Sequence, residues 1–391
     1  MLLVKNASPK KILLSSGRSP VTLHLARQLH AAGHQVYVAD ATKVHLCIFS
    51  NAVTKNFHIP SPRFSPKEYL EAILKIVTDE KIDLLIPVYE EILYLTKEET
   101  KFPSYCKIFA SSFSLLNELH NKWLFCTKQQ GFGIKTPNTF LIRTQDDLNR
   151  LDPSRSYALK ACYSRASLNM KKLNVGESLP NLCIETHNPW IAQEWLSGKK
   201  FCTYSICQQG KIKAHATYPV RFAIDGNSCL TFESIEHQKI YEWIENFVEK
   251  AEFTGQIAFD FIEDGNNLYA IECNPRATSG VFLFEASDQM DQAFLNQSEQ
   301  VLFPKKGAAK QVASGMLLYG WKKSSYPANT MRNFLKTLMR IRDVVFHSKD
   351  LKPFFSIPIV FAAFLYSCKK SSLTLPEILT FDNEWNGEII P

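Results

Sequence analysis

The stretch YAIECNPRATSG, residues 269–280, places an acid, an amide and an arginine at the end of an apolar strand. Alternate residues of a strand share a face, so Glu272 and Asn274 point the same way. DGNN, residues 264–267, is a turn signal between two apolar strands and predicts a hairpin. A three-residue loop at 265–267 would set Asp260 across from Glu272. Two carboxylates and an amide oxygen on one face are ligands that suit Mg²⁺.

The alternative for this hairpin is a sheet face open to water, on which the acids are only solvated. The flanking residues argue against it, because their apolar side chains indicate that both faces are partly buried. They are Phe259, Phe261, Ile262 and Ile271. A buried carboxylate pair without a cation is costly, since one acid must stay protonated. We therefore expect Asp260, Glu272 and Asn274 to hold a metal.

The elements that position this hairpin begin with a parallel unit within residues 10–100. Helical spacing of apolar residues, with Pro20 early and Gly33 at the end, marks its first helix. The expected elements are a strand at 10–16, a helix at 19–33, a strand at 34–40, a helix at 66–81 and a strand at 82–88. This βαβαβ order predicts a parallel sheet.

From about 134 to 275 the pattern changes to short strands with few long helices. Helices are expected at about 112–130, 145–151 and 234–253. A parallel N-terminal unit followed by antiparallel strands indicates an α/β and α+β multidomain protein, and a chain of 391 residues is long enough for two or three domains.

Composition excludes several classes of protein. Ten cysteines without a CxxC or Cys/His cluster indicate reduced thiols and no zinc site, hence a cytoplasmic setting, and the N-terminal apolar run is too short for a signal peptide. The net charge is +7, but residues 301–391 hold 13 Lys or Arg against 6 Asp or Glu, which leaves residues 1–300 neutral. We therefore expect no nucleic-acid partner.

Two common nucleotide motifs are weak or missing. The turn SSGRSP after the first strand has one glycine where a dinucleotide fingerprint has three, so pyrophosphate binding there is a weak hypothesis. No GxxxxGK[ST] sequence exists, which removes the P-loop interpretation.

The hairpin resembles the metal-binding end of the ATP-grasp superfamily, in which an acid on one strand is followed by E-x-N-P-R on the next. Three further stretches resemble family motifs in the right order. They are HNKWLF at 120–125 (the Asn/Asp-Lys pair that opens the lid-domain helix), YALKACYSRAS at 157–167 (the lid strand with its lysine) and WIAQEWLSG at 190–198 (the adenine hinge). The chain looks most like short members similar to the carbamoyl-phosphate synthase large chain and like carboxylate–amine ligases.

This resemblance implies an ATP-grasp fold with an N-terminal Rossmann-like βαβ domain, a lid domain and an antiparallel-sheet C-terminal domain. The implied boundaries are 1–111 for the first domain, 112–300 for the ATP-grasp domain with a lid at about 134–195, and 301–391 for a basic C-terminal extension packed on the body.

The resemblance also implies the cofactors ATP and Mg²⁺ (or Mn²⁺) and a role for each matching residue. The lysines face the nucleotide phosphates, the hinge binds adenine through backbone groups, the acid face holds the metal, and the arginines stabilise the transferring phosphoryl group or bind the substrate carboxylate. The residues are, in that order, Lys122 and Lys160; Gln193, Glu194, Trp195 and Leu196; Asp260, Glu272 and Asn274; Arg276 and Arg221.

The sequence departs from the family pattern at two places. The loop after Lys160 contains no glycine, so Ser164, Arg165 and Ser167 would have to replace backbone donors to phosphate. Lys200 stands where an acid often contacts the ribose.

The leading functional hypothesis is a ligase that uses ATP to join a small-molecule carboxylate to an amine. A nucleotide-binding scaffold or regulatory protein with little turnover is the second hypothesis, and a metal-independent carbohydrate or lipid module the third. Complete retention of the charged set favours catalysis, because binding adenine alone does not need it.

The apolar run at 354–368, between Lys352 and Lys369-Lys370, is too short to span a bilayer. We expect a helix packed on the body of the protein. The alternative is weak contact of residues 352–370 with an anionic membrane surface.

Overall fold

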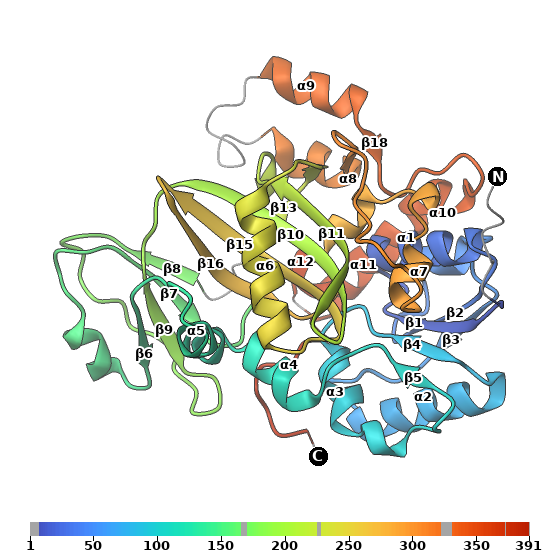
Figure 1. Cartoon of the computed structure of the whole chain (residues 1–391), viewed down its shortest axis with the longest axis horizontal. Helices are drawn as coiled ribbons and strands as arrows, with labels where there is room; N and C mark the ends of the chain where they lie inside the picture. The colour runs from blue at the N-terminus through green and yellow to red at the C-terminus, as the bar shows by residue number, and fades with distance from the viewer. Residues whose placement is uncertain (1–7, 166–169, 225–227, 322–330, 372, 391) are drawn as a thin grey trace.

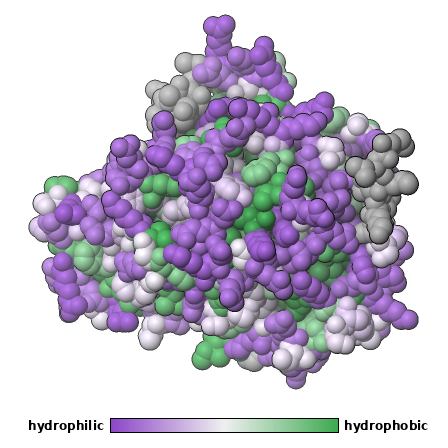
Figure 2. Space-filling model, in the orientation of Figure 1, coloured by the Kyte–Doolittle hydropathy of each residue, from purple (hydrophilic) through white to green (hydrophobic). Residues whose placement is uncertain are grey.

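The structure is a computed structural model, and it describes residues 8–165, 170–224, 228–321, 331–371 and 373–390. Ser167, one of the three expected phosphate-loop residues, lies outside them. The face in Figure 2 is mainly hydrophilic, broken by small apolar patches.

A five-stranded parallel sheet forms the N-terminal part of the molecule (Figure 1). In spatial order its strands are β3 (Lys55–His58), β2 (Gln35–Asp40), β1 (Lys11–Ser15), β4 (Leu84–Ile86) and β5 (Lys107–Ile108). Helices α1 (Pro20–Ala31) and α2 (Pro66–Glu80) cover opposite faces of the sheet. Their buried side chains accordingly belong to two separate hydrophobic cores. The expected Rossmann-like unit is present, with β3, β5 and α3 (Glu91–Lys97) in addition.

The order of this sheet creates a crevice. The chain runs outward from β1 to β2 and β3 and then returns to place β4 on the other side of β1. Connections therefore leave β1 and β4 in opposite directions, which opens a gap at the carboxyl ends of these two strands.

A four-stranded antiparallel sheet forms the centre of the molecule (Figure 1). Its strands, in spatial order, are β11 (Lys211–Pro219), β10 (Lys199–Gln208), β15 (Gly255–Asp264) and β16 (Asn267–Asn274). Helix α6 (Gln238–Lys250) covers one face, where the rings of Trp243 and Phe247 lie 5.1 and 5.3 Å from that of Phe259.

A second four-stranded antiparallel sheet falls within the range expected for the lid. In spatial order its strands are β6 (Thr139–Ile142), β9 (Trp190–Glu194), β7 (Tyr157–Ala161) and β8 (Met170–Leu173). It has a small core of its own, to which Ile142, Leu159 and Trp190 belong. The helix expected at 145–151 is a 3₁₀ helix at Gln145–Arg150.

The single helix expected at 112–130 is wrong, because the chain forms α4 (Phe113–His120) and α5 (Lys122–Gly131). Asn121 lies between them with an extended backbone, and its side-chain oxygen accepts hydrogen bonds from the N–H groups of Trp123 and Leu124. An asparagine that caps the next helix in this way ends the first one.

The C-terminal part contributes small elements to several places. The strands are β12 (Ala223–Ile224), β13 (Ser228–Cys229), β14 (Thr231–Glu233), β17 (Ala309–Gln311) and β18 (Arg342–Asp343), and the helices are α7 (Met290–Phe294), α8 (Ala313–Gly315), α9 (Met331–Arg340), α10 (Lys352–Phe355), α11 (Ile357–Ser371) and α12 (Leu375–Ile378). Arg27 of α1 pairs with Asp350 at 2.9 Å, which ties this part to the N-terminal sheet.

Helix α11 contains the apolar run. It buries Val360 and Phe364 and leaves Ile359, Leu365 and Tyr366 exposed. None of the described helices combines the length and the apolar composition that crossing a bilayer requires.

The final described segment returns to the N-terminal sheet. Residues 380–390, here called the C-terminal strap, form neither helix nor strand. The end of the strap lies beside α3, since Lys97 donates a 3.1 Å hydrogen bond to the carbonyl oxygen of Ile390.

Candidate active site

The hairpin β15–β16 has the expected pairing, with Asp260 opposite Glu272. The loop is shorter than expected, because Asp264 pairs with Asn267 across a two-residue turn. A β-bulge at Ile271 adds the residue that restores the pairing. Bulges of this kind re-aim side chains, and here Ile271 lines a cavity beside the face that carries Glu272.

The acid face has the electrostatics of a cation site. Burial raises the pKa of Asp260 to about 6, and the neighbouring Glu272 adds to this effect. Lys122 Nζ lies 3.6 Å from Glu272 Oε1. The side-chain oxygen of Asn274 accepts a hydrogen bond of 2.9 Å from Arg276. The three predicted metal ligands therefore lie together, with a lysine and an arginine at their margins.

Two buried ammonium groups stand beside these acids. Lys122 donates a 2.6 Å hydrogen bond to the carbonyl oxygen of Ser164, just after β7. Lys160 donates a 3.2 Å bond to the side-chain oxygen of Gln193, and burial lowers its pKa to about 8. Both lysines are less than a tenth exposed, so they are not solvated surface charges.

The expected hinge residues meet Lys160 at one cavity. Its lining comes from the lid sheet, the hinge and the hairpin: Ala158, Lys160, Met170, Gln193, Glu194, Trp195, Leu196, Lys200, Ile262 and Ile271. The volume is about 70 Å³. Sites for nucleotide-sized ligands usually exceed roughly 300 Å³, so this conformation is too closed to hold ATP.

Two side chains of the hinge, those of Glu194 and Trp195, contact residues of the neighbouring lid segment. Glu194 accepts hydrogen bonds from Asn138 and Arg155, at 2.8 and 3.1 Å. The ring of Trp195 lies 4.5 Å from Lys172 Nζ. These contacts engage both side chains within the protein, and binding of adenine by the hinge backbone stays a prediction.

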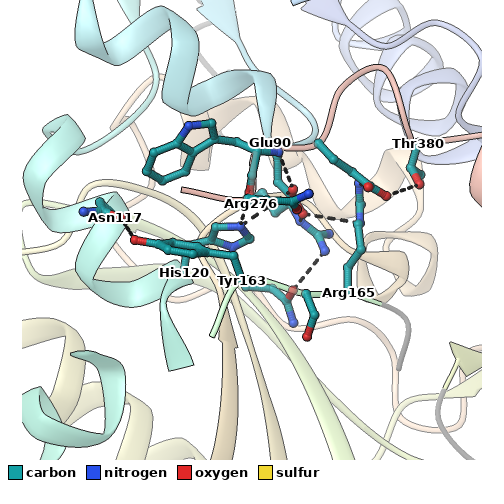
Figure 3. A network of polar contacts seen from close by, with 12 residues as sticks. Glu90, Asn117, His120, Tyr163, Arg165, Arg276 and Thr380 are labelled. Carbon is teal, nitrogen blue, oxygen red and sulfur yellow. Dashed lines mark hydrogen bonds and ion pairs between the residues drawn. The ribbon is translucent and has the colours of Figure 1, made fainter. Parts of the chain in front are cut away.

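Glu90, which follows β4, is the anion of a second charged cluster (Figure 3). Arg165 Nε and Arg276 Nε lie 3.3 and 3.7 Å from Glu90 Oε1. His120 Nε2 lies 3.7 Å from Oε2, which also accepts a 3.1 Å hydrogen bond from the backbone N–H of Trp385. The N-terminal sheet, α4, the loop after β7, the hairpin and the strap therefore meet at one carboxylate.

Burial alone would raise the pKa of Glu90, but Arg165, His120 and Arg276 together lower it to about 2. Burial lowers the pKa of Arg276, and the nearby Arg165 adds to this effect. Burial also lowers the pKa of His120. The cluster therefore favours an ionised Glu90 and a neutral His120 near pH 7.

Residues 119–280 match the family model for the ATP-grasp domain. This part of the chain is an ATP-grasp domain. An uncharacterized protein of Methanocaldococcus jannaschii is 24% identical over 221 residues. That match covers 55% of this chain and 56% of the relative, so it spans little more than half of either protein.

Solved structures share the fold. N5-carboxyaminoimidazole synthetase from Staphylococcus aureus complexed with ADP has a TM-score of 0.60 and 14% identity, over 75% of this chain and 79% of that one. Biotin carboxylase from Campylobacter jejuni has a TM-score of 0.58 and 16% identity, over 74% and 71%. L-amino acid ligase from Bacillus licheniformis has a TM-score of 0.54 and 13% identity, over 69% and 68%. The ATP-grasp fold therefore extends well beyond the family match.

A divalent cation fits the acid face of the ATP-grasp domain. Burial and the neighbouring Glu272 raise the pKa of Asp260 although Lys160 and Arg276 act to lower it, so the nearby positive charges only partly offset the burial of this carboxyl group. Within the described ranges no three His, Cys, Asp or Glu side chains are grouped to hold a metal. Two carboxylates and one amide are nevertheless enough for Mg²⁺, which completes its shell with water and substrate oxygens.

Arg221 lies apart from these groups. Its guanidinium is half exposed and pairs with Glu233 of β14. The structure therefore does not bring it to the predicted metal ligands, and its role stays a prediction.

Sequence reasoning did not single out Glu90 or His120. It also expected Arg165 to face phosphate, whereas the Arg165 guanidinium pairs with Glu90 and lies 3.9 Å from Glu384. The one available signal was the position of Glu90, an acid just after a parallel strand, where ligand sites occur.

Proposed function

We propose that the chain is an ATP- and Mg²⁺-dependent ligase that activates a carboxylate as an acylphosphate for attack by an amine. The observation that carries the proposal is the pairing of Asp260 with Glu272 beside two buried ammonium groups, Lys122 and Lys160. A protein that only binds nucleotide does not need this costly set of buried charges.

The reaction has two steps. A carboxylate oxygen attacks the γ-phosphorus of ATP, and ADP leaves. The amine nitrogen then attacks the carbonyl carbon, phosphate leaves and the nitrogen loses a proton. Activation replaces a poor leaving group, hydroxide or oxide, with phosphate.

The residues of the chain then have distinct roles. Lys122 and Lys160 contact the phosphates as positive charges, and Arg276 stabilises the charge on the transferring group. Asp260, Glu272 and Asn274 hold Mg²⁺ or Mn²⁺, which neutralises phosphate charge when bound.

The similar structures support the nucleotide and the reaction class. One of them is named a synthetase and was solved with ADP, and another is named an L-amino acid ligase. We therefore propose ATP as the nucleotide and a small-molecule carboxylate and amine as substrates.

A nucleotide-binding scaffold with little turnover is the second candidate. The small cavity and the engagement of Lys122 by Ser164 and Glu272 favour it. The two candidates differ in one measurement, the release of phosphate.

The test is phosphate release from Mg²⁺-ATP across a panel of carboxylates and amines, with mass spectrometry of the products. We expect substrate-dependent release by the wild-type chain, and its loss in Glu272→Gln. Asp264→Asn, at the exposed end of β15, is the matched control and should keep full activity.

ATP binding without phosphate release for any pair would favour the scaffold. Release at the wild-type rate by Glu272→Gln would contradict the assignment of the metal face.

A further inference from the structure

The C-terminal strap crosses the crevice between β1 and β4. Asn383 Nδ2 donates a 2.9 Å hydrogen bond to the hydroxyl of Ser16, which follows β1. Trp385 N–H donates to Glu90, which follows β4. In open parallel sheets this crevice is where ligands bind. Here residues of the same chain fill it.

The strap is held as a bound peptide is held. The carbonyl of Asp382 accepts hydrogen bonds from the hydroxyl of Ser61 and the N–H of Arg63, at 2.8 and 3.2 Å. The carbonyl of Glu384 accepts a 3.0 Å bond from the hydroxyl of Tyr94. No described residue of the strap joins a β-sheet. Its backbone carbonyl groups are instead hydrogen-bonded by side chains and loop N–H groups of the N-terminal part.

Arginines of the N-terminal part also pair with acidic side chains of the strap. Arg18 is 3% exposed and donates to both carboxylate oxygens of Asp382, at 2.7 and 2.9 Å. Its other donors bind Asp40, so Arg18 keeps one partner if Asp382 leaves. Arg63 pairs with Glu388 at 3.2 Å. Bidentate arginine–carboxylate pairs are strong and geometrically specific.

An aromatic pocket receives Trp385, which is 5% exposed. Its ring lies 5.1 Å from that of Tyr163, 5.6 Å from Phe113 and 6.5 Å from His120. Tyr163 follows lid strand β7, so the strap links the lid to the N-terminal sheet. Tryptophan and arginine in desolvated pockets are enriched among the few residues that dominate the binding energy of interfaces.

We propose that this crevice is a binding site for an acidic peptide that carries an aromatic residue three positions after an aspartate, and that the strap occupies the site in cis. The proposal goes beyond the ligase reaction, because it concerns binding and holds with or without turnover of ATP. An external peptide of this chemistry displaces the strap, and the lid then loses its link through Trp385.

The tethered strap is a strong competitor. A tethered segment has an effective concentration in the millimolar range, so wild-type protein binds an external peptide weakly. Loosening the strap must therefore reveal the site.

The experiment uses the full chain and a fluorescein-labelled peptide of residues 379–390. The variant Asp382→Asn/Trp385→Ala removes the two main anchors of the strap. We expect it to bind the peptide at least about tenfold more tightly than wild type, by fluorescence anisotropy. A peptide with the same two substitutions should not bind.

The matched control is Asp350→Asn, which breaks a similarly buried arginine pair away from the crevice. It should bind the peptide no better than wild type. Equal affinity of the strap variant and wild type for the peptide would overturn the proposal. So would binding of the substituted peptide as tightly as the unsubstituted one, or binding of the peptide by Asp350→Asn as tightly as by the strap variant.

A second measurement does not depend on folding of the variant. Wild-type protein is mixed with about 1 mM isotope-labelled peptide, and hydrogen–deuterium exchange of its own residues 380–390 is followed by mass spectrometry. We expect exchange there to accelerate severalfold, with β1 and β4 unchanged. Unaltered exchange of the strap would show that it is a permanent structural segment.

Discussion

Glu90 supplies negative charge that offsets the positive side chains between the N-terminal sheet and the ATP-grasp domain. It is almost fully buried and faces two arginines and a histidine. Removing one partner of a buried charged pair leaves the others uncompensated, which costs about 3–5 kcal/mol. Loss of this carboxylate is therefore expected to destabilise the packing of the segments that meet around it.

We predict that Glu90→Gln lowers the free energy of unfolding by roughly 3 kcal/mol at pH 7. The pKa of Glu90 is about 2 in the folded protein and 4.5 ordinarily. Its contribution is complete above about pH 4.5 and is lost as the pH falls toward 2. Urea denaturation of both proteins between pH 3 and 7, as an approximate range, measures this.

Glu98→Gln is the control, since Glu98 makes only a local pair with Lys101. It should leave the unfolding curve almost unchanged. A Glu90→Gln protein as stable as wild type at pH 7 would remove Glu90 from this role.

Lys160 gives a second prediction, on pH and nucleotide affinity. Burial holds its pKa at about 8, and contact with phosphate favours the protonated form. ATP binding should therefore take up a proton above pH 8, and affinity should fall as the pH rises from about 8 to 10. Calorimetry in buffers of different ionisation enthalpy measures both quantities.

Lys160→Met should bind ATP more weakly and without this proton uptake. Lys171→Met, at an exposed lysine of β8, should behave as wild type. A pH dependence that persists in Lys160→Met would assign it to another group.

Residue-scale prediction worked where a local rule applied. The pairing of Asp260 with Glu272 was predictable because side chains alternate along a strand and hairpins pair neighbours, whereas the role of these residues and of Asn274 as metal ligands stays a prediction. Glu90 and His120 lie far from the hairpin in sequence, and no local pattern joins them to it. Only the packing of domains brings them within reach of Arg276.

At the scale of elements, the backbone of the turn between the hinge and β10 lies very close to the backbone of β15. A Cβ at Gly198 would overlap the backbone carbonyl oxygen of Glu263 on β15. Backbone cannot move aside as a flexible side chain can. The hinge therefore lies against β15 only because residue 198 is glycine.

We predict that Gly198→Ala lowers the free energy of unfolding by about 1–3 kcal/mol and weakens ATP binding, because the hinge must move away from the cavity. Thermal unfolding and calorimetry measure the two effects. Gly131→Ala, where an added Cβ meets no atom within 4 Å, should be neutral or slightly stabilising. Equal stability of the two variants would contradict the close approach.

Element boundaries show what sequence patterns can and cannot predict. The helix at Pro20–Ala31 was predictable because its cap, proline and apolar spacing agree. The break at Asn121 was missed because apolar residues continue across it, and the register of the hairpin was obtained with the wrong loop because a bulge at Ile271 has no sequence signal.

At the scale of the whole molecule, helix α11 of the basic C-terminal part packs against the N-terminal sheet and its helix α1. Phe364 of α11 is 6% exposed and packs in the core shared with α1 and β1, whereas Ile359 on the same helix is 59% exposed. The helix therefore has one packed side and one free side.

We predict that Phe364→Ala lowers the free energy of unfolding by roughly 3 kcal/mol, because it empties a buried site, and that Ile359→Ala does not. Denaturant unfolding distinguishes them. Sedimentation with anionic vesicles tests the alternative use of residues 352–370. Salt-sensitive binding that Ile359→Ala weakens would favour membrane contact over packing alone.

The pairing of Arg18 with Asp382 joins residues 364 positions apart. On a ribosome that adds about 5–20 residues per second, Asp382 is made roughly 20–70 s after Arg18. From the synthesis of β5 until the end of that interval, the parallel sheet can form while its crevice stays open, with Asp40 as the only one of the two acids present. By the proposal made above, a nascent chain would bind acidic segments of other proteins at this crevice until its own strap has been made.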